Sequence, residues 1–204
     1  MIKQDKIFKE LIRKDNKLKK ILDASKNCPF LLEPIIKNEI LFYELAQSIV
    51  GQQISAKAAD TIWARIVSGS QNKNSFLVYI SNTKLEWARK QGLSQRKHEY
   101  IKSIAANIIS NKLSLEYVAN LKDNEAKKYL ELQRGVGPWT SEMFLMFAYK
   151  RLDVFSIGDI ALKRAVSEIY NIDRSDDKAI IAISEAWKPY RSIVCWYLWE
   201  YLGV

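Results

Sequence analysis

The residues with the clearest chemical potential are a glycine-containing turn and an acid that follows it. Gly135-Val136-Gly137-Pro138 is a Gly-x-Gly turn that leads into a helical pattern, and Asp159 lies 22 residues after Gly137. Both glycines can adopt positive φ at little cost, as a tight reversal requires, and Pro138 suits the first helical position. The free N–H groups of such a turn form an anion site that can hold a phosphate. For this turn alone, an ordinary helix–helix connection is the alternative.

Asp159 stands directly before a second helical pattern, which begins at Ile160. An aspartate in this position is typical of a helix N-cap. The same carboxylate can also serve as a catalyst, with one oxygen directed to the helix and one to a substrate. The residues alone leave both roles open.

Helical periodicity runs through almost the whole chain, and convincing alternating strands are absent, so we predict an all-α fold. Predicted helix starts are Ser55, Thr83 (with Glu86 as a capping box), Ser94 and Asp123, and Gly92 is a predicted helix end. The main predicted helices cover residues 6–22, 39–50, 56–67, 95–110, 124–133, 138–149, 160–170, 177–187 and 190–202.

Composition limits the function classes. The chain has 204 residues, 48% hydrophobic, with a net charge of +9 and a pI near 9.4, which favours a polyanionic partner. Cys28, Cys195 and the single His98 are too few for an iron–sulfur cluster or a closed zinc site, so we expect no metal and no cofactor. No apolar run approaches the roughly 18 residues of a membrane span, and we expect no membrane partner.

Four blocks of the sequence resemble one family. In chain order they are Ile49-Val50-Gly51-Gln52-Gln53-Ile54-Ser55, Leu132-x-x-Gly135-Val136-Gly137-Pro138-Trp139-Thr140-Ser141-Glu142-Met143, Val154-Phe155-x-x-x-Asp159 and Trp187-Lys188-Pro189-Tyr190-Arg191-Ser192. They resemble the helix-hairpin-helix (HhH-GPD) DNA glycosylase superfamily over roughly residues 39–200. Within that superfamily, the chain is most similar to the 3-methyladenine DNA glycosylase II branch.

The resemblance implies an architecture. We expect two helical lobes with the active site in the cleft between them, and no β-containing N-terminal domain. One lobe is expected to comprise residues 1–37 and 156–204, and the other residues 38–155. The second lobe would carry the helix-hairpin-helix motif at residues 131–149.

The resemblance also implies a reaction. Alkylated bases would be flipped out of duplex DNA and released by hydrolysis of the N-glycosidic bond. Asp159 occupies the position of the superfamily's essential aspartate, which would stabilise an oxocarbenium-like transition state and orient water. Trp139 stands where strand-cutting relatives carry a lysine nucleophile, so the resemblance implies a monofunctional enzyme.

Further residues receive roles from the same resemblance. Trp139, Trp187 and Met143 are expected to line the base pocket, where tryptophan rings attract a cationic base. Gln53 would fill the gap that the flipped base leaves. The remaining expected DNA contacts are Gly135, Val136, Gly137, Thr140, Lys163 and Arg191.

Two rival functions remain open at this point. One is a non-catalytic helix-hairpin-helix module that only binds DNA, and the other is a glycosylase for oxidised or mismatched bases. We expect a monomer that acts on double-stranded DNA containing alkylated bases. It would be cytoplasmic and nucleoid-associated in a bacterium or archaeon, and nuclear in a eukaryote.

Overall fold

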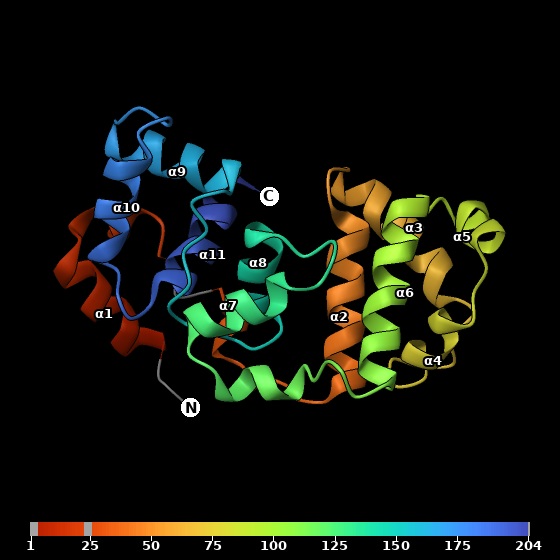
Figure 1. Ribbon diagram of the computed structural model, residues 1–204. Helices are drawn as coiled ribbons and strands as arrows, with labels where there is room; N and C mark the ends of the chain where they lie inside the picture. Colours follow the sequence, from red (N-terminus) through yellow and green to blue (C-terminus); the bar gives the residue numbers. More distant parts are fainter. Residues whose placement is uncertain (1–3, 23–25, 204) are drawn as a thin grey trace. The chain divides into compact units, whose positions relative to one another are not determined.

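The computed structural model describes residues 4–22 and 26–203, and within these residues all regular structure is helical (Figure 1). The prediction of an all-α fold is therefore confirmed. The chain divides into two compact units. The first unit comprises Met1–Pro34 with Leu145–Val204, and the second comprises Ile35–Phe144. The lobe boundaries and the cleft that the resemblance implies stay predictions.

The first unit combines the two ends of the chain. Its elements are α1 (Gln4–Lys14), η1 (Asn16–Lys20), η2 (Pro29–Leu31), α9 (Ile160–Tyr170), α10 (Asp177–Glu185) and α11 (Arg191–Leu202). Helices α9 and α11 pack against each other. Leu162 and Val166 of α9 and Val194 and Leu198 of α11 are fully buried, so these two helices form the core that supports Asp159.

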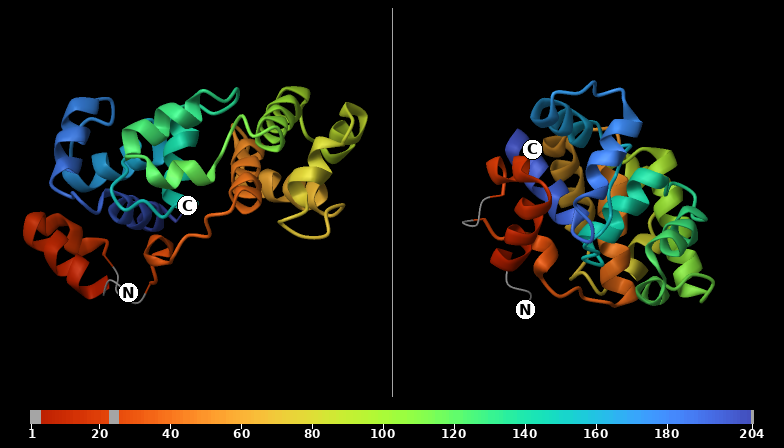
Figure 2. Two further views of the ribbon diagram at one scale, coloured as in Figure 1. Left: turned by 60° about the horizontal axis from the view of Figure 1, so that its bottom comes forward. Right: turned by 90° about the vertical axis from the view of Figure 1, so that its left-hand side faces the viewer.

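The second unit is a continuous stretch of chain. Its elements are α2 (Asn38–Gly51), α3 (Ala56–Val67), α4 (Phe76–Ser81), α5 (Leu85–Gln91), α6 (Gln95–Ile109), η3 (Glu116–Asn120), α7 (Asp123–Glu131) and the start of α8 (Pro138–Phe147). Helices α2 and α6 lie side by side (Figures 1 and 2). Phe42 of α2, Trp63 of α3 and Phe76 of α4 form a buried aromatic cluster.

The predicted first helix at residues 6–22 is interrupted. Asp15 is extended, with φ −146° and ψ 99°, and its side chain accepts a hydrogen bond from the Lys17 N–H. This side chain competes with the helical backbone for the N–H group, as aspartate often does. Helix α1 therefore ends at Lys14, and a short 3-10 helix follows.

Several predicted helix boundaries are confirmed. The side chains of Ser55, Ser94 and Asp159 each accept a hydrogen bond from the third residue beyond them, so all three are N-caps. Gly92 ends α5 in the left-handed region, with φ +88°. The strongest local signals in the sequence therefore located these helix ends correctly.

Two predicted N-caps are wrong. Thr83 directs its hydroxyl to the Ile80 carbonyl, 2.8 Å away, and to His98, so the residue after it, Lys84, is the N-cap of α5. Asp123 is the first residue of α7, and Lys122 is the N-cap. The sequence does not reveal the Thr83 outcome, because its hydroxyl is engaged by residues outside α5.

Candidate active site

Helices α7 and α8 form a helical hairpin, and Gly135 is essential to its turn. Gly135 has φ +91°, in the region that favours glycine. A Cβ atom at this position would lie 2.2 Å from Cδ2 of Tyr100. Val136, which follows, is buried, and its N–H donates to the Gln133 carbonyl over 3.0 Å. Both the backbone conformation and the ring of Tyr100 therefore require glycine at residue 135.

Gly137 is different, and the expectation of positive φ at this residue is wrong. Only Gly92, Gly135 and Gly203 have positive φ among the glycines of the described chain. A Cβ atom added to Gly137 would meet no atom within 4 Å. The fold thus needs no glycine at residue 137. The open space next to this backbone, at the start of α8, instead lets an outside group approach the helix N-terminus closely.

Polar contacts brace the two helices of the hairpin. The Ser141 hydroxyl donates to Glu131 Oε1 over 2.9 Å. Lys127 of α7 forms an ion pair with Glu142 of α8, whose side chain is buried. Because both contacts join α7 to α8, they fix the direction in which the N-terminus of α8 points.

Gln52 joins the hairpin to the end of α2. Its Nε2 atom donates to the Gly135 carbonyl and to Thr140 Oγ1, both over 2.9 Å. Thr140 is buried, and its hydroxyl is directed to Gln52, which supports a structural role; its expected contact with DNA stays a prediction. Sequence reasoning assigned no role to Gln52, although it stands next to Gln53 in the same block.

Gln53 occupies a strained turn between α2 and α3. Its φ is +58°, and its side chain is exposed. A left-handed conformation costs a non-glycine residue about 1–2 kcal/mol. Such strain is common at functional sites. The left-handed conformation is therefore compatible with the expected role of Gln53, which is to fill the gap that a flipped base leaves in the duplex. That role stays a prediction.

The two pocket candidates on α8 differ in exposure. Trp139 is 39% exposed in the first turn of the helix, whereas Met143, one turn later on the same face, is 7% exposed. Trp139 therefore offers surface to a ligand, whereas Met143 is buried, and the roles expected for both in the base pocket stay predictions.

Asp159 is a buried N-cap. Its Oδ1 atom accepts the Leu162 N–H over 2.9 Å and the Trp199 indole N–H over 3.3 Å, and the residue is 8% exposed. The two donors hold the carboxylate in one orientation. Trp199, on α11, was missed by sequence reasoning because 40 residues separate it from the acid.

The chain before Asp159 is held by the start of α11. The Arg191 guanidinium binds Asp153 through Nε–Oδ1 (2.8 Å) and Nη2–Oδ2 (3.1 Å), a two-point geometry that fixes orientation. The Ser192 hydroxyl accepts the Val154 N–H over 2.9 Å, and the Ser192 N–H donates to the Leu152 carbonyl over 2.9 Å. Arg191 therefore has a structural partner, and its expected contact with DNA stays a prediction.

Lys163 and Trp187 also have partners within the first unit. Lys163 forms an ion pair with Asp177 over 2.5 Å. Trp187 exposes no surface, and its indole N–H donates to Asp15 Oδ2 over 3.0 Å. Its ring lies edge-on against Phe155, with the ring centroids 5.8 Å apart. This burial supports a role in the core, and the roles expected for Trp187 in the base pocket and Lys163 on DNA stay predictions.

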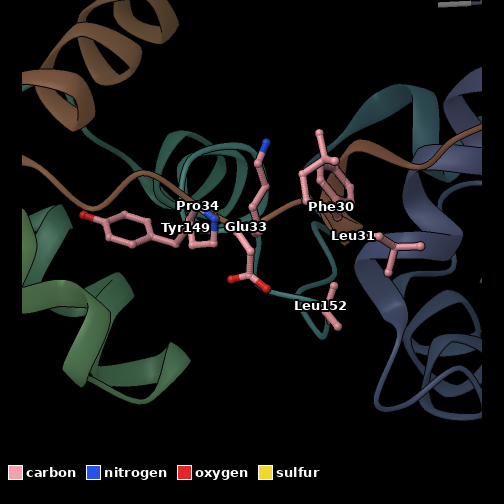
Figure 3. A pocket seen from close by; sticks show the side chains of 8 residues that line it. Phe30, Leu31, Glu33, Pro34, Tyr149 and Leu152 are labelled. Carbon is pink, nitrogen blue, oxygen red and sulfur yellow. The ribbon is translucent and has the colours of Figure 1, made fainter. Parts of the chain in front are cut away.

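A separate cavity of about 540 Å³ lies in the first unit (Figure 3). Its walls come from the η2 region and from the chain that follows α8, with Tyr149 at one end and Leu31 and Leu152 at the other. None of the residues expected in the site lines it.

Residues 4–22 and 26–203 contain no group of three or more His, Cys, Asp or Glu side chains that could hold a metal ion. No helix among them has both the length and the apolar character needed to cross a membrane.

A helical hairpin with an open glycine at the start of its second helix is the arrangement that the resemblance to helix-hairpin-helix proteins predicts. The pattern of the HhH-GPD superfamily of base excision DNA repair proteins matches residues 46–189. The chain belongs to this superfamily.

Known relatives agree with that assignment. The chain is 30% identical to the DNA-3-methyladenine glycosylase of Saccharomyces cerevisiae, over 93% of this chain and 77% of that protein. It is 28% identical to the DNA-3-methyladenine glycosylase of Bacillus subtilis, over 92% of this chain and 68% of that protein.

Solved structures are also similar. The Schizosaccharomyces pombe 3-methyladenine DNA glycosylase Mag1, in complex with abasic DNA, superposes with a TM-score of 0.82 at 27% identity, covering 98% of this chain and 97% of that chain. The DNA-3-methyladenine glycosidase of Bacillus halodurans gives a TM-score of 0.79 at 30% identity, covering 97% and 89%.

Proposed function

We propose that the protein is a monofunctional DNA glycosylase that hydrolyses the N-glycosidic bond of alkylated purines in duplex DNA. The observation that carries this proposal is Asp159, a buried carboxylate held by two N–H donors at the start of α9. Membership of a base excision repair superfamily and relatives named 3-methyladenine glycosylases support it.

The chemistry requires one fixed anion. When the base departs with the bonding electron pair, positive charge develops on C1′ and O4′ of the deoxyribose. The Asp159 carboxylate stabilises this charge and orients a water molecule. The water oxygen bonds to C1′, and the proton that it loses passes to solvent. Alkylation at N3 or N7 already makes the base cationic and a good leaving group, so no strong general acid is needed.

The residues of the second unit bind the substrate in this proposal. The turn from Gly135 to Gly137 and the start of α8 hold a DNA phosphate without regard to sequence. Gln53 fills the gap in the duplex, and the exposed indole of Trp139 stacks on the flipped base. Since Trp139 replaces a lysine nucleophile, base removal leaves the strand uncut.

The partner in this proposal is DNA. The similar protein Mag1 was solved in complex with abasic DNA. We further propose that the protein acts as a monomer, on DNA in the nucleoid of a prokaryote or in the nucleus of a eukaryote.

The experiment is base release from duplex DNA containing defined alkylated purines, in the presence of a metal chelator. The wild-type protein should release the base, and Asp159→Asn should lower the rate by on the order of 10²–10³-fold or more. Duplex binding should persist in that variant, because asparagine also caps helices well.

Asp176→Asn is the matched control. Asp176 is the N-cap of α10, where it accepts a hydrogen bond from the Ala179 N–H over 3.0 Å. The control should keep full activity. Full activity in Asp159→Asn would overturn the mechanism, and a wild-type protein that binds DNA but releases no lesion would support the non-catalytic DNA-binding alternative.

A further inference from the structure

The end of α2 is tied in two directions within the second unit. On one side, the Gln52 amide donates to Gly135 O and Thr140 Oγ1 of the hairpin. On the other side, Lys97 Nζ of α6 donates to the Val50 carbonyl over 2.8 Å and to the Gln52 carbonyl over 2.7 Å. Lys97, Gln52 and the hairpin thus form one continuous chain of hydrogen bonds.

Gln53 follows this tied residue directly. Its backbone is left-handed, and its side chain is exposed. A strained conformation of this kind persists only where surrounding contacts determine it. The contacts on both sides of Gln52 supply that constraint, because they fix its backbone carbonyl and its side chain at the same time.

We propose that Gln52 and Lys97 are positioning residues that make the Gln53 turn and the phosphate-binding hairpin one rigid piece. The hairpin holds the DNA backbone without reading sequence. A rigid link to Gln53 then sets where the Gln53 side chain, the wedge that fills the gap, enters the duplex relative to the bound phosphate. This inference rests on the proposed function and assigns a role to two residues that need not contact DNA.

Lys97 suits this task because it is partly buried and its ammonium group donates to backbone carbonyls. Burial lowers the pKa of Lys97, and both of its acceptors are backbone carbonyls at the end of α2. A cation at the carbonyl end of a helix also interacts favourably with the helix dipole. The lysine therefore holds the end of α2 whatever side chain stands at residue 53.

The test separates base flipping from DNA binding. Gln52→Met keeps the size of the side chain but removes both donors, and Lys97→Met removes the ammonium group. Each variant should lower the single-turnover rate of base release roughly tenfold to a hundredfold, since small misplacements of reacting groups have effects of this size. Affinity for undamaged duplex should stay within about twofold, because the hairpin N–H groups remain.

Lys102→Met is the matched control. Lys102 lies on the same helix, and its Nζ donates to the Thr83 carbonyl over 2.6 Å. This variant loses a comparable contact, so it should show a similar drop in melting temperature but unchanged base release. Equal loss of activity in Lys97→Met and Lys102→Met would overturn the proposal, because general destabilisation would then explain both.

A second measurement detects base flipping independently of cleavage of the N-glycosidic bond. Fluorescence of 2-aminopurine placed beside the lesion should rise on binding of the wild-type protein and rise less with Gln52→Met. In a Gln53→Ala background, adding Gln52→Met should change the signal and the rate less than twofold, since the link then has no wedge to position. Independent, multiplicative effects of the two changes would overturn the inference. A wild-type protein that raises the 2-aminopurine fluorescence on binding but releases no base would overturn only the proposed function.

Discussion

The hairpin turn and the segment that carries Asp159 are built in different ways. At the turn, the features that matter are backbone conformations, namely the positive φ of Gly135 and the open backbone of Gly137. Around Asp159, they are side-chain partners, namely the Arg191–Asp153 pair and the Trp199 indole. The turn therefore depends on backbone conformations that glycine permits, whereas the orientation of the Asp159 carboxylate depends on side chains that are distant in the sequence. Four variants test this contrast.

The largest effect is expected at Gly135. Gly135→Ala forces alanine into φ +91° and drives its Cβ into the Tyr100 ring. The left-handed conformation costs about 1–2 kcal/mol and overpacking another 1–3 kcal/mol, so stability should fall by about 2–5 kcal/mol in denaturant unfolding.

Gly137→Ala is the contrasting variant at the same turn. Since no atom lies within 4 Å of the added Cβ, its stability should change by less than about 0.5 kcal/mol. Its affinity for DNA should fall about tenfold, the equivalent of roughly one hydrogen bond. Equal stability of the two variants would contradict the distinction between a glycine that the fold requires and one that the ligand requires.

The next effect is expected at the Arg191–Asp153 pair. Asp153→Ala removes both carboxylate contacts of the guanidinium and leaves the chain that leads to Asp159 held by the Ser192 contacts and the Asp153 carbonyl. The rate of base release should fall by about tenfold or more, and stability by about 1–3 kcal/mol, while duplex affinity stays unchanged. Glu168→Ala is the control, because it breaks the exposed Arg164–Glu168 pair, which contributes about 0–1 kcal/mol. A large loss of duplex affinity in Asp153→Ala would indicate that this region binds DNA directly.

The smallest effect is expected at Trp199. Trp199→Phe keeps an aromatic ring against Phe147, whose centroid is 5.8 Å away, but removes the N–H that reaches Asp159 over 3.3 Å. Because the Leu162 N–H remains, the rate should fall only about threefold to tenfold, in line with one weak hydrogen bond. Trp196→Phe on the same helix should leave the rate unchanged. An equal loss of rate in Trp199→Phe and Trp196→Phe would show that the hydrogen bond between Trp199 and Asp159 is not the cause.

Features that depend on local backbone chemistry were predictable from the sequence. Ser55, Ser94 and Asp159 are caps because a short polar side chain before an apolar helical pattern satisfies a free N–H group. Gly135 has positive φ for a similar reason, since a tight reversal needs it. The all-α class follows from periodicity along the whole chain.

Features that depend on distant partners were not predictable. A basic side chain such as Arg191 or Lys163 looks like a phosphate contact until its acidic neighbour is known, and Asp153 lies 38 residues from Arg191. Trp187 likewise offers no sign in the sequence of its hydrogen bond to Asp15, 172 residues away. At Gly137 the motif is clear from the sequence, but the sign of φ could not be predicted from it. The conformation of the whole turn sets that angle.

The division of the chain also has a consequence for its synthesis. Residues 35–144 form one compact unit, whereas the unit with Asp159 needs both residues 1–34 and residues 145–204. At a translation rate of roughly 5–20 residues per second, the first 34 residues wait several seconds or more for their partners. The hairpin unit can fold during that interval. A nascent chain would thus form its helical hairpin before Asp159 is in place.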